Sequence, residues 1–311
     1  MTRLANYIPI LDWGRRYGRA TLTNDAIAAL IVTIMLIPQS LAYAMLAGLP
    51  AEVGLYASIL PLVAYAIFGS SRTLAVGPVA VVSLMTATTV GEIAAQGTEA
   101  YLVAAALLAL VSGTMLVGMG LLKLGFVANF LSHPVISGFI TASGLLIAAG
   151  QVKHLLGIQS GGHTLPEVAS GLIGNLHAVN LPTLAIGTGV LAFLYFVRLN
   201  LKSLLVSLGL KSRLADVVTK AGPVGAVAAT ILAVTLFDLG AAGVPLVGAI
   251  PQGLPLPRLP VIDLDTIVAL AGPALLISLI GFVESVSVAQ TLAAKRRQRI
   301  APDQELIGLG A

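Results

Sequence analysis

Glu284 is the acidic side chain that lies deepest inside an apolar stretch of this sequence. It separates the apolar runs 275–283 and 286–294. A charged and unpaired carboxylate is costly in a membrane-spanning segment, so such a group is either protonated or faces a polar cavity. We therefore expect Glu284 to take up and release a proton. The alternative is a carboxyl group that forms hydrogen bonds within the helix packing.

A second candidate is the turn Gly77-Pro78, which precedes a short apolar run. Proline is well tolerated in the first turn of a helix, so the pattern predicts a helix from Pro78 to about Val90. About a dozen residues span roughly 18–20 Å, whereas a membrane-spanning helix needs about 20 residues. The N-terminus of this half-helix should lie near mid-membrane, where its unpaired N–H groups and positive dipole end attract an anion.

Gln39 and Tyr43 form a third candidate, in the apolar stretch 25–47. Pro38 removes one backbone hydrogen bond and predicts a kink just before Gln39. The two polar side chains are four residues apart and share one helix face. From the residues alone, an interhelical hydrogen bond explains Gln39 equally well, and packing is the more common role of an aromatic residue such as Tyr43.

The composition places these residues in a membrane protein. Of 311 residues, 57% are hydrophobic and 10% are charged, and the mean hydropathy is +0.98. Soluble domains carry about a quarter charged residues, so we expect an all-α polytopic membrane protein. The absence of cysteine excludes disulfides, thiol catalysis and thiolate metal sites. The pI of about 9.5 is attributed to membrane topology and not to nucleic-acid binding.

Eight apolar stretches can be identified, and they lie at approximately 25–47, 53–68, 76–90, 101–122, 133–152, 182–197, 222–240 and 266–293. The segments 156–180 and 241–265 are predicted to be external loops. The segment 198–221 is predicted to be a basic internal linker with a short surface helix. The third stretch still connects opposite sides of the membrane if residues 73–76 run extended inside the protein.

The basic residues predict the orientation. With the N-terminus inside, fifteen of the 17 Lys and Arg residues lie on the inner side, and only Lys153 and Arg258 lie outside. This bias follows the positive-inside rule. We expect no cleavable signal peptide in residues 1–24, but a cytoplasmic N-terminal segment followed by a transmembrane transport domain over residues 25–311.

A weak internal repeat relates the first and eighth stretches. Residues 38–44 (PQSLAYA) align without gaps with residues 283–289 (VESVSVA), although chance can produce a match of this length. The two stretches cross the membrane in opposite directions, as an inverted repeat of seven spans requires. Residues 303–311 are predicted to begin a ninth span. On this interpretation the chain is a fragment that contains the first repeat and the start of the second.

Three long motifs resemble the sulfate permease (SulP) family of anion transporters, which includes prestin. They are IPQSLAYAMLAGLPAEVGLYAS, FGSSRTLAVGPVAVVSLM and GFVESVSVAQTLA, and the likeness extends over nearly the whole chain. The resemblance implies a seven-plus-seven inverted-repeat transporter fold, in which a core of spans 1–4 and 8–11 moves against a gate. It also implies a second half-helix and a cytoplasmic STAS domain beyond the present sequence.

The resemblance implies roles for individual residues. In the family, span 1 and the N-termini of the two half-helices line the anion pocket, which assigns substrate binding to Gln39, Tyr43, Gly77, Pro78, Val79 and Ala80. Prestin-like animal members carry Phe at the position of Val79, so the pocket here should be wider or differently shaped. In proton-coupled members the carboxylate at the position of Glu284 is linked to proton movement.

Other polar residues are assigned structural roles. Arg72 is expected at the inner mouth as a snorkelling residue and not as an anion ligand. The sequence offers no zinc-binding pattern around His133, His154, His163 and His177, so no metal or cofactor is expected. It also shows no nucleophile motif or phosphate-binding loop, so the protein is not expected to be an enzyme.

The predicted function is secondary active transport of inorganic or small organic anions such as sulfate, by proton-coupled symport or anion exchange. The resemblance further implies a homodimer, and we expect a multi-pass protein of the bacterial inner membrane that contacts lipid and no nucleic acid. One alternative is a bicarbonate or dicarboxylate transporter coupled to sodium or protons. Another is a membrane protein that binds an anion without transporting it.

Overall fold

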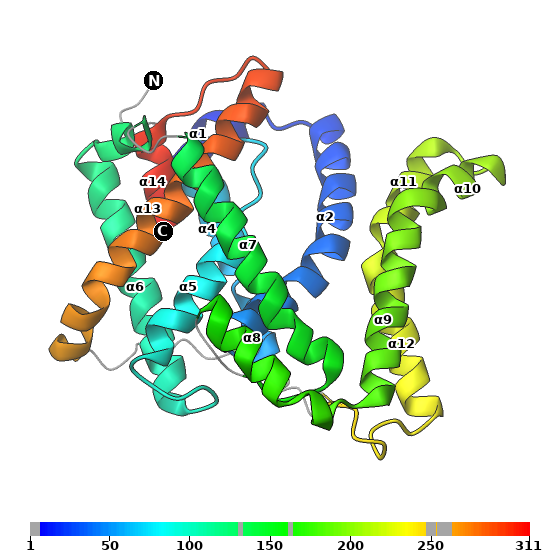
Figure 1. The fold of residues 1–311 in the computed structure, drawn as a ribbon. Helices are drawn as coiled ribbons and strands as arrows, with labels where there is room; N and C mark the ends of the chain where they lie inside the picture. Colours follow the sequence, from blue (N-terminus) through cyan, green and yellow to red (C-terminus); the bar gives the residue numbers. More distant parts are fainter. Residues whose placement is uncertain (1–6, 130–132, 161–163, 247–252, 254–262) are drawn as a thin grey trace. The chain divides into compact units, whose positions relative to one another are not determined.

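The computed structural model describes residues 7–129, 133–160, 164–246, 253 and 263–311. Among these residues every regular element is a helix (Figure 1). Five helical segments are long and apolar enough to cross a membrane, and a sixth candidate is a pair of helices bent by 50°. The chain is therefore an all-α protein with several membrane-length helices, as the composition predicts.

The helices divide into two compact units. Unit 1 comprises Met1–Leu22, Gln39–Thr141 and Gln252–Ala311, and unit 2 comprises Thr23–Pro38 and Ala142–Pro251. All residues of the candidate anion site belong to unit 1. Spans 2–4 and 8 fall in unit 1 and spans 6 and 7 in unit 2, whereas the first part of span 1, expected in the core, falls in unit 2.

Two helices contribute to both units, and the others belong to one. The shared helices are α2 (Arg19–Leu46) and α7 (His133–Leu156). The remaining helices of unit 1 are α1 (Ile10–Trp13), η2 (Gly14–Arg16), α3 (Ala51–Tyr56), α4 (Leu60–Phe68), α5 (Ala80–Gly91), α6 (Glu99–Leu121), η3 (Leu124–Asn129), α13 (Leu264–Lys295) and α14 (Pro302–Gly310). Those of unit 2 are α8 (Leu165–Gly174), η4 (Leu176–Ala178), α9 (Leu181–Phe196), η5 (Val197–Leu201), α10 (Lys202–Ser207), α11 (Ser212–Lys220) and α12 (Gly222–Leu236).

The predicted apolar stretches correspond to these helices, but their bounds differ in several places. The helix α2 begins at Arg19 and continues through Pro38, and one boundary between the units falls directly after this proline. The segment 156–180, predicted as a loop, contains α8 and η4. The helix of span 6 does not stop where the basic linker was predicted to begin, because α9, η5 and α10 together form a 27-residue segment, Leu181–Ser207.

The core of unit 1 is built around α6. One cluster of buried side chains joins α6 to the end of α5 and to α13, and its members are Val90, Tyr101, Ala104, Leu107, Leu108, Leu270, Ala274 and Ile277. A second cluster joins the other end of α6 to α13 and α14, and its members are Leu116, Phe282, Val283, Val286 and Leu306. A buried hydrogen bond of 2.8 Å between the hydroxyls of Ser112 and Ser278 links α6 and α13 between these clusters.

The short helix α14 packs closely against α6 (Figure 1). Glycines on both helices allow this approach. A Cβ atom added at Gly310 would lie 2.6 Å from the carbonyl oxygen of Gly113, and one added at Gly120 would lie 2.8 Å from the carbonyl oxygen of Asp303. Small residues permit such backbone-to-backbone contact between membrane helices. The start of the predicted ninth span is therefore an integral part of unit 1.

The N-terminus of α13 carries a side-chain cap. The Asp263 carboxylate accepts hydrogen bonds from the backbone N–H of Thr266 at 3.0 Å and from the Thr266 hydroxyl at 2.5 Å. These bonds lower the pKa of Asp263, because they stabilise the ionised form. The cap satisfies one of the unpaired N–H groups of the helix that carries Glu284.

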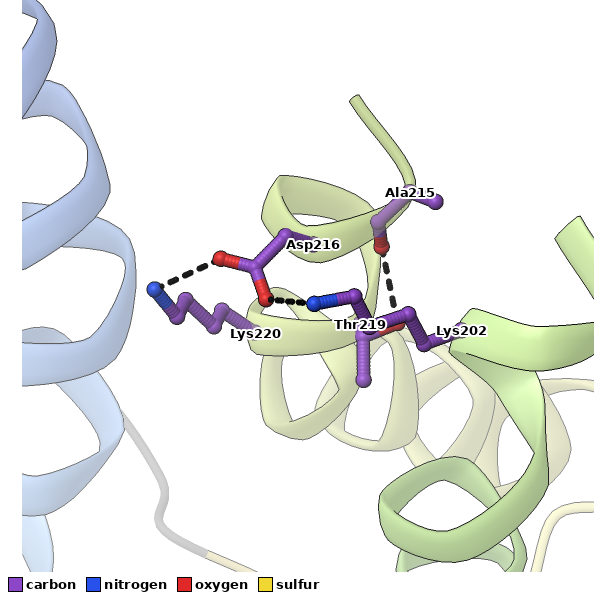
Figure 2. A network of polar contacts seen from close by, with 5 residues as sticks. All are labelled: Lys202, Ala215, Asp216, Thr219 and Lys220. Atoms are coloured by element: carbon purple, nitrogen blue, oxygen red, sulfur yellow. Dashed lines mark hydrogen bonds and ion pairs between the residues drawn. The ribbon is translucent and has the colours of Figure 1, made fainter. Parts of the chain in front are cut away.

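In unit 2, α9 packs against α12, and the basic segment at one end of this pair contains α10 and α11. Figure 2 shows how a small polar network connects these two short helices. The Asp216 carboxylate lies 2.8 Å from the Lys220 ammonium on the same helix and 3.0 Å from the Lys202 ammonium on α10. All three side chains are exposed, so these ion pairs contribute little stability.

Candidate functional site

The half-helix predicted after Gly77-Pro78 is present as α5, an apolar helix of 12 residues. Its start differs from the prediction, because the helix begins at Ala80 and not at Pro78. Val79 is the N-cap residue, and its backbone is extended with φ −123° and ψ 135°. Valine is β-branched and fits such an extended backbone well. Gly77, Pro78 and Val79 therefore form the approach to the helix, and Ala80 is its first residue.

Among the described residues, no side chain caps the backbone N–H groups in the first turn of α5. The first backbone hydrogen bond of the helix runs from the N–H of Ser83 to the carbonyl oxygen of Val79 at 2.9 Å. The N–H groups of Ala80, Val81 and Val82 precede this bond, and Val79 has no side-chain oxygen with which to cap them. An uncapped helix N-terminus of this kind can bind an anion through its N–H groups and its dipole.

Glu284 lies on a helix that approaches this turn. A Cβ atom added at Gly281 of α13 would lie 3.8 Å from Cγ2 of Val82 in the first turn of α5. Gly281 and Glu284 are three residues apart, so they share one face of α13. The Glu284 side chain is half-buried, and within the described part of the chain it forms no hydrogen bond or ion pair. The helix that carries Glu284 therefore approaches the first turn of α5 at Gly281.

Gln39 and Tyr43 lie on the part of α2 that belongs to unit 1. Gln39 is exposed and Tyr43 is half-buried. The adjacent face of α2 packs on α3 and on the turn that follows it, where the Ser40 hydroxyl is 2.6 Å from the Ser58 hydroxyl in a buried contact. The side-chain hydrogen bonds found among the described residues do not connect Gln39 or Tyr43 to α5. Their role in the site stays a prediction.

One buried polar residue near this region was not predicted from the sequence. Glu305 of α14 is fully buried and accepts four hydrogen bonds from Tyr65, Ser70 and Ser71. The sequence contains one signal for it, because Glu305 is the last acidic residue before the apolar run that begins the predicted ninth span. Its partners lie more than 230 residues earlier in the chain, so the sequence alone gives no means of identifying them.

Arg72 follows the turn that leads toward α5, and it is paired with an acidic residue. Its guanidinium lies 3.3 Å from the Asp12 carboxylate, and the two side chains are 49% and 37% exposed. This exposure is compatible with the predicted position at a membrane surface. The pair contributes little stability.

The described residues contain no group of three or more His, Asp or Glu side chains that could hold a metal ion. His163, one of the histidines considered above, lies outside these residues, and so does Arg258.

The Sulfate permease family model matches residues 22–311 of the chain. The chain is 35% identical over 307 residues to "Probable sulfate transporter MT1781" of Mycobacterium tuberculosis (strain CDC 1551 / Oshkosh). It is 38% identical over 316 residues to "Sulfate transporter 4.1, chloroplastic" of Arabidopsis thaliana. Both alignments cover 99% of this chain but only 52% and 44% of the relatives, so the chain spans about half the length of these curated relatives.

Solved structures share the fold. The structure of the murine Solute Carrier 26 family member A9 anion transporter in the inward-facing state matches with a TM-score of 0.83 and 26% identity. This match covers 99% of the present chain and 52% of the murine chain. The transmembrane domain of a cyanobacterium bicarbonate transporter matches in fold with a TM-score of 0.78 and 21% identity, covering 94% of this chain and 72% of that chain.

These matches agree in family and in architecture. The structural neighbours have the inverted-repeat transporter fold, and the present chain covers its first repeat and the beginning of the second. The family model alone covers nearly the whole sequence. The chain belongs to the sulfate permease family, a family of multi-pass membrane anion transporters.

Proposed function

We propose that this chain forms part of a secondary active transporter that moves sulfate or a similar small anion across a membrane. The observation that carries the proposal is the uncapped N-terminus of α5, which begins inside unit 1 after an extended approach. In the proposed site, the N–H groups of the first turn and the turn residues Gly77, Pro78, Val79 and Ala80 hold the anion. Gln39 donates its amide N–H, and Tyr43 contributes its hydroxyl.

Sulfate is proposed as the substrate because two relatives that match over nearly the whole chain are named as sulfate transporters. A helix N-terminus recognises negative charge more than chemical identity, so other small anions should compete. Val79 has a short side chain compared with the Phe of prestin-like members. We therefore propose that the site is wider or differently shaped than theirs and admits an anion larger than chloride.

We further propose that Glu284 carries the coupling proton and that unit 1 moves as the transporting core. Residues 1–24 are proposed as a cytoplasmic segment and residues 25–311 as transport domain. The protein is proposed to reside in a plasma membrane as a homodimer, with its N-terminus in the cytoplasm. Support for the orientation comes from the basic residues, fifteen of which fall on the proposed inner side.

The orientation can be tested with single cysteines, because the sequence contains none. We expect a cysteine at Ala241 to react with an impermeant thiol reagent in intact cells, and a cysteine at Ser212 to remain unlabelled. Both native residues are exposed, so the protein itself shields neither position, and only the membrane separates the reagent from a cytoplasmic cysteine. Labelling of both cysteines after permeabilisation is the control. Labelling at 212 but not at 241 in intact cells would reverse the proposed topology.

The anion site can be tested with Gln39→Ala in the complete gene product. One amide hydrogen bond to an anion is worth on the order of 1 kcal/mol, so we expect binding to weaken about five- to tenfold without loss of folding. The measurement is the concentration of sulfate that half-saturates exchange of labelled sulfate in proteoliposomes. Gln151→Ala is the matched control, because it removes an exposed amide from α7.

Equal half-saturation for the parent, Gln39→Ala and Gln151→Ala would remove Gln39 from the site. Absence of sulfate exchange by the parent protein, with a different anion transported in its place, would reject the proposed substrate.

A further inference from the structure

Glu305 is a fully buried carboxylate in α14, outside the residues proposed to bind the anion. Its Oε1 accepts hydrogen bonds from the backbone N–H of Ser70 at 2.9 Å, the Ser70 hydroxyl at 2.5 Å and the backbone N–H of Ser71 at 3.0 Å. Its Oε2 accepts a hydrogen bond from the Tyr65 hydroxyl at 2.6 Å. Four donors occupy the accepting capacity of a carboxylate, which allows burial without a cationic partner.

Neighbouring residues of α14 hold the same turn. The Gln304 side-chain amide donates to the carbonyl oxygen of Phe68 at 2.6 Å, which satisfies an unpaired carbonyl at the end of α4. The backbone N–H of Ala301 donates to the Ser70 hydroxyl at 3.0 Å. A Cβ atom added at Gly308 would lie 2.8 Å from Cα of Gly69. The helix α14 and its N-cap residue therefore contact the turn of residues 69–71 through side chains, the backbone and close packing.

This turn begins the segment that leads to α5. The Ser71 hydroxyl accepts hydrogen bonds from the backbone N–H groups of Thr73 and Leu74 at 3.4 and 3.2 Å. Residues 74–79 then form neither helix nor strand. No internal ladder of hydrogen bonds fixes this stretch, so its course depends on how its two ends are held. The far end is the first turn of α5, which approaches Gly281 of α13 through Val82.

We propose that Glu305 is a positioning residue that holds the turn of residues 69–71 and thereby sets the place of the α5 N-terminus. The effect on anion binding rests on the proposed function, because the anion is proposed to bind at that N-terminus. In this role Glu305 does not contact the anion. It acts through the Ser70 and Ser71 backbone and the extended segment that follows.

The position of the α5 N-terminus can be measured without any anion. The pair Val82→Cys and Gly281→Cys places two thiols where α5 and α13 approach each other, and residues 1–311 contain no cysteine of their own. The rate of disulfide formation under a mild oxidant, in the complete gene product in membranes, reports how often the two positions meet.

Three variants are compared in this cysteine background. Glu305→Ala removes the contacts to the turn, and we expect the cross-linking rate to fall at least fivefold. Glu305→Gln keeps an oxygen for the Ser70 and Ser71 N–H groups and offers an amide to the Tyr65 oxygen, so the rate should stay within about twofold of the parent. Tyr65→Phe is the matched control, because it removes a hydrogen bond to the same carboxylate but leaves the hydrogen bonds from Ser70 and Ser71 to Glu305 in place.

Tyr65→Phe distinguishes positioning from general stability. We expect this variant to lower the thermal midpoint in detergent, because it leaves Oε2 of a buried carboxylate without its partner. We expect its cross-linking rate to remain that of the parent. An unchanged rate in Glu305→Ala, or an equal fall in Glu305→Ala and Tyr65→Phe, would overturn the proposal.

Ser70→Ala keeps the test decisive if Glu305→Ala does not fold. It removes the shared hydroxyl between Ala301 and Glu305 without altering α14, and we expect the cross-linking rate to fall at least twofold. A rate equal to that of the parent would count against the proposal.

Sulfate exchange provides a second and separate measurement. In the variants without cysteines, Glu305→Ala should raise the half-saturating sulfate concentration at least fivefold, whereas Glu305→Gln should restore it. A fall in cross-linking with unchanged half-saturation would support the positioning role and would show that the anion binds elsewhere. The two measurements therefore separate failure of the positioning role from failure of the proposed anion site.

Discussion

Gly54→Ala is expected to lower both the amount of folded protein and its thermal midpoint. A Cβ atom at this position would overlap the carbonyl oxygen of Ser40 and would lie 2.6 Å from the Ser40 carbonyl carbon. Both atoms belong to the backbone of α2 and cannot rotate away. Overpacking of this kind costs about 1–3 kcal/mol, a large share of a net stability of roughly 5–15 kcal/mol.

Two buried hydrogen bonds of Ser58 lie beside the contact between Gly54 and Ser40. The Ser58 hydroxyl donates to the carbonyl oxygen of Gly54 at 2.8 Å and lies 2.6 Å from the Ser40 hydroxyl. A shift of α3 away from α2 separates these buried groups, and unsatisfied buried polar groups add a further cost. We therefore expect the damage to exceed that of overpacking alone.

The matched control is Gly118→Ala on α6, where an added Cβ atom meets nothing within 4 Å. Alanine has a higher helix propensity than glycine, so this variant should be as stable as the parent or slightly more stable. The measurements are the monodisperse fraction after detergent extraction and the thermal midpoint of both variants. Equal midpoints for the two variants would show that α2 and α3 do not pack as described.

Much of this fold follows from local sequence patterns. Long apolar runs predict the membrane-length helices, because a helix is the element that satisfies its own backbone hydrogen bonds in lipid. The length of α5 is likewise a local property, since it reflects the distance between the Gly77-Pro78 turn and the end of the apolar run. The half-helix was therefore predictable as an element. Its first residue was not, because Val79 keeps an extended backbone.

The parts that could not be predicted depend on contacts between distant residues. Glu305 contacts Tyr65 and Ser70 only when α14 packs into unit 1, and no local spacing in the sequence predicts that contact. The approach of Gly281 to Val82 is of the same kind. Gln39 and Tyr43 differ, because their shared face follows from helix geometry. Whether that face contacts the anion depends on tertiary packing, and the Gln39→Ala substitution tests it.

Two buried or half-buried carboxylates in unit 1 have opposite surroundings. Glu305 accepts four hydrogen bonds, from Tyr65, Ser70 and Ser71. Glu284 forms no hydrogen bond or ion pair with another described residue and shares a helix face with Gly281 beside α5. An unpaired carboxylate inside a membrane-spanning helix gains from neutralisation. This contrast favours Glu284 as the group that takes up the coupling proton.

Glu284→Gln is expected to abolish proton-driven accumulation of sulfate and its dependence on external pH while sulfate exchange continues. An anion bound at the α5 N-terminus repels the Glu284 carboxylate, and a proton on that carboxylate removes the repulsion. Anion binding and protonation therefore favour each other by reciprocal linkage. Glutamine imitates the protonated side chain at every pH, so the anion still binds and crosses, but no proton needs to move with it.

The measurement compares sulfate accumulation against a pH gradient with exchange at equal pH, in proteoliposomes that contain the complete gene product. Glu99→Gln is the matched control, because it makes the same chemical change at an exposed position on α6. It should accumulate sulfate with the pH dependence of the parent. If Glu284→Gln does so as well, Glu284 is a packing residue and the transport is driven by another ion or by exchange alone. If Glu284→Gln loses both exchange and accumulation, Glu284 belongs to the anion site itself, because exchange requires anion binding but no proton coupling.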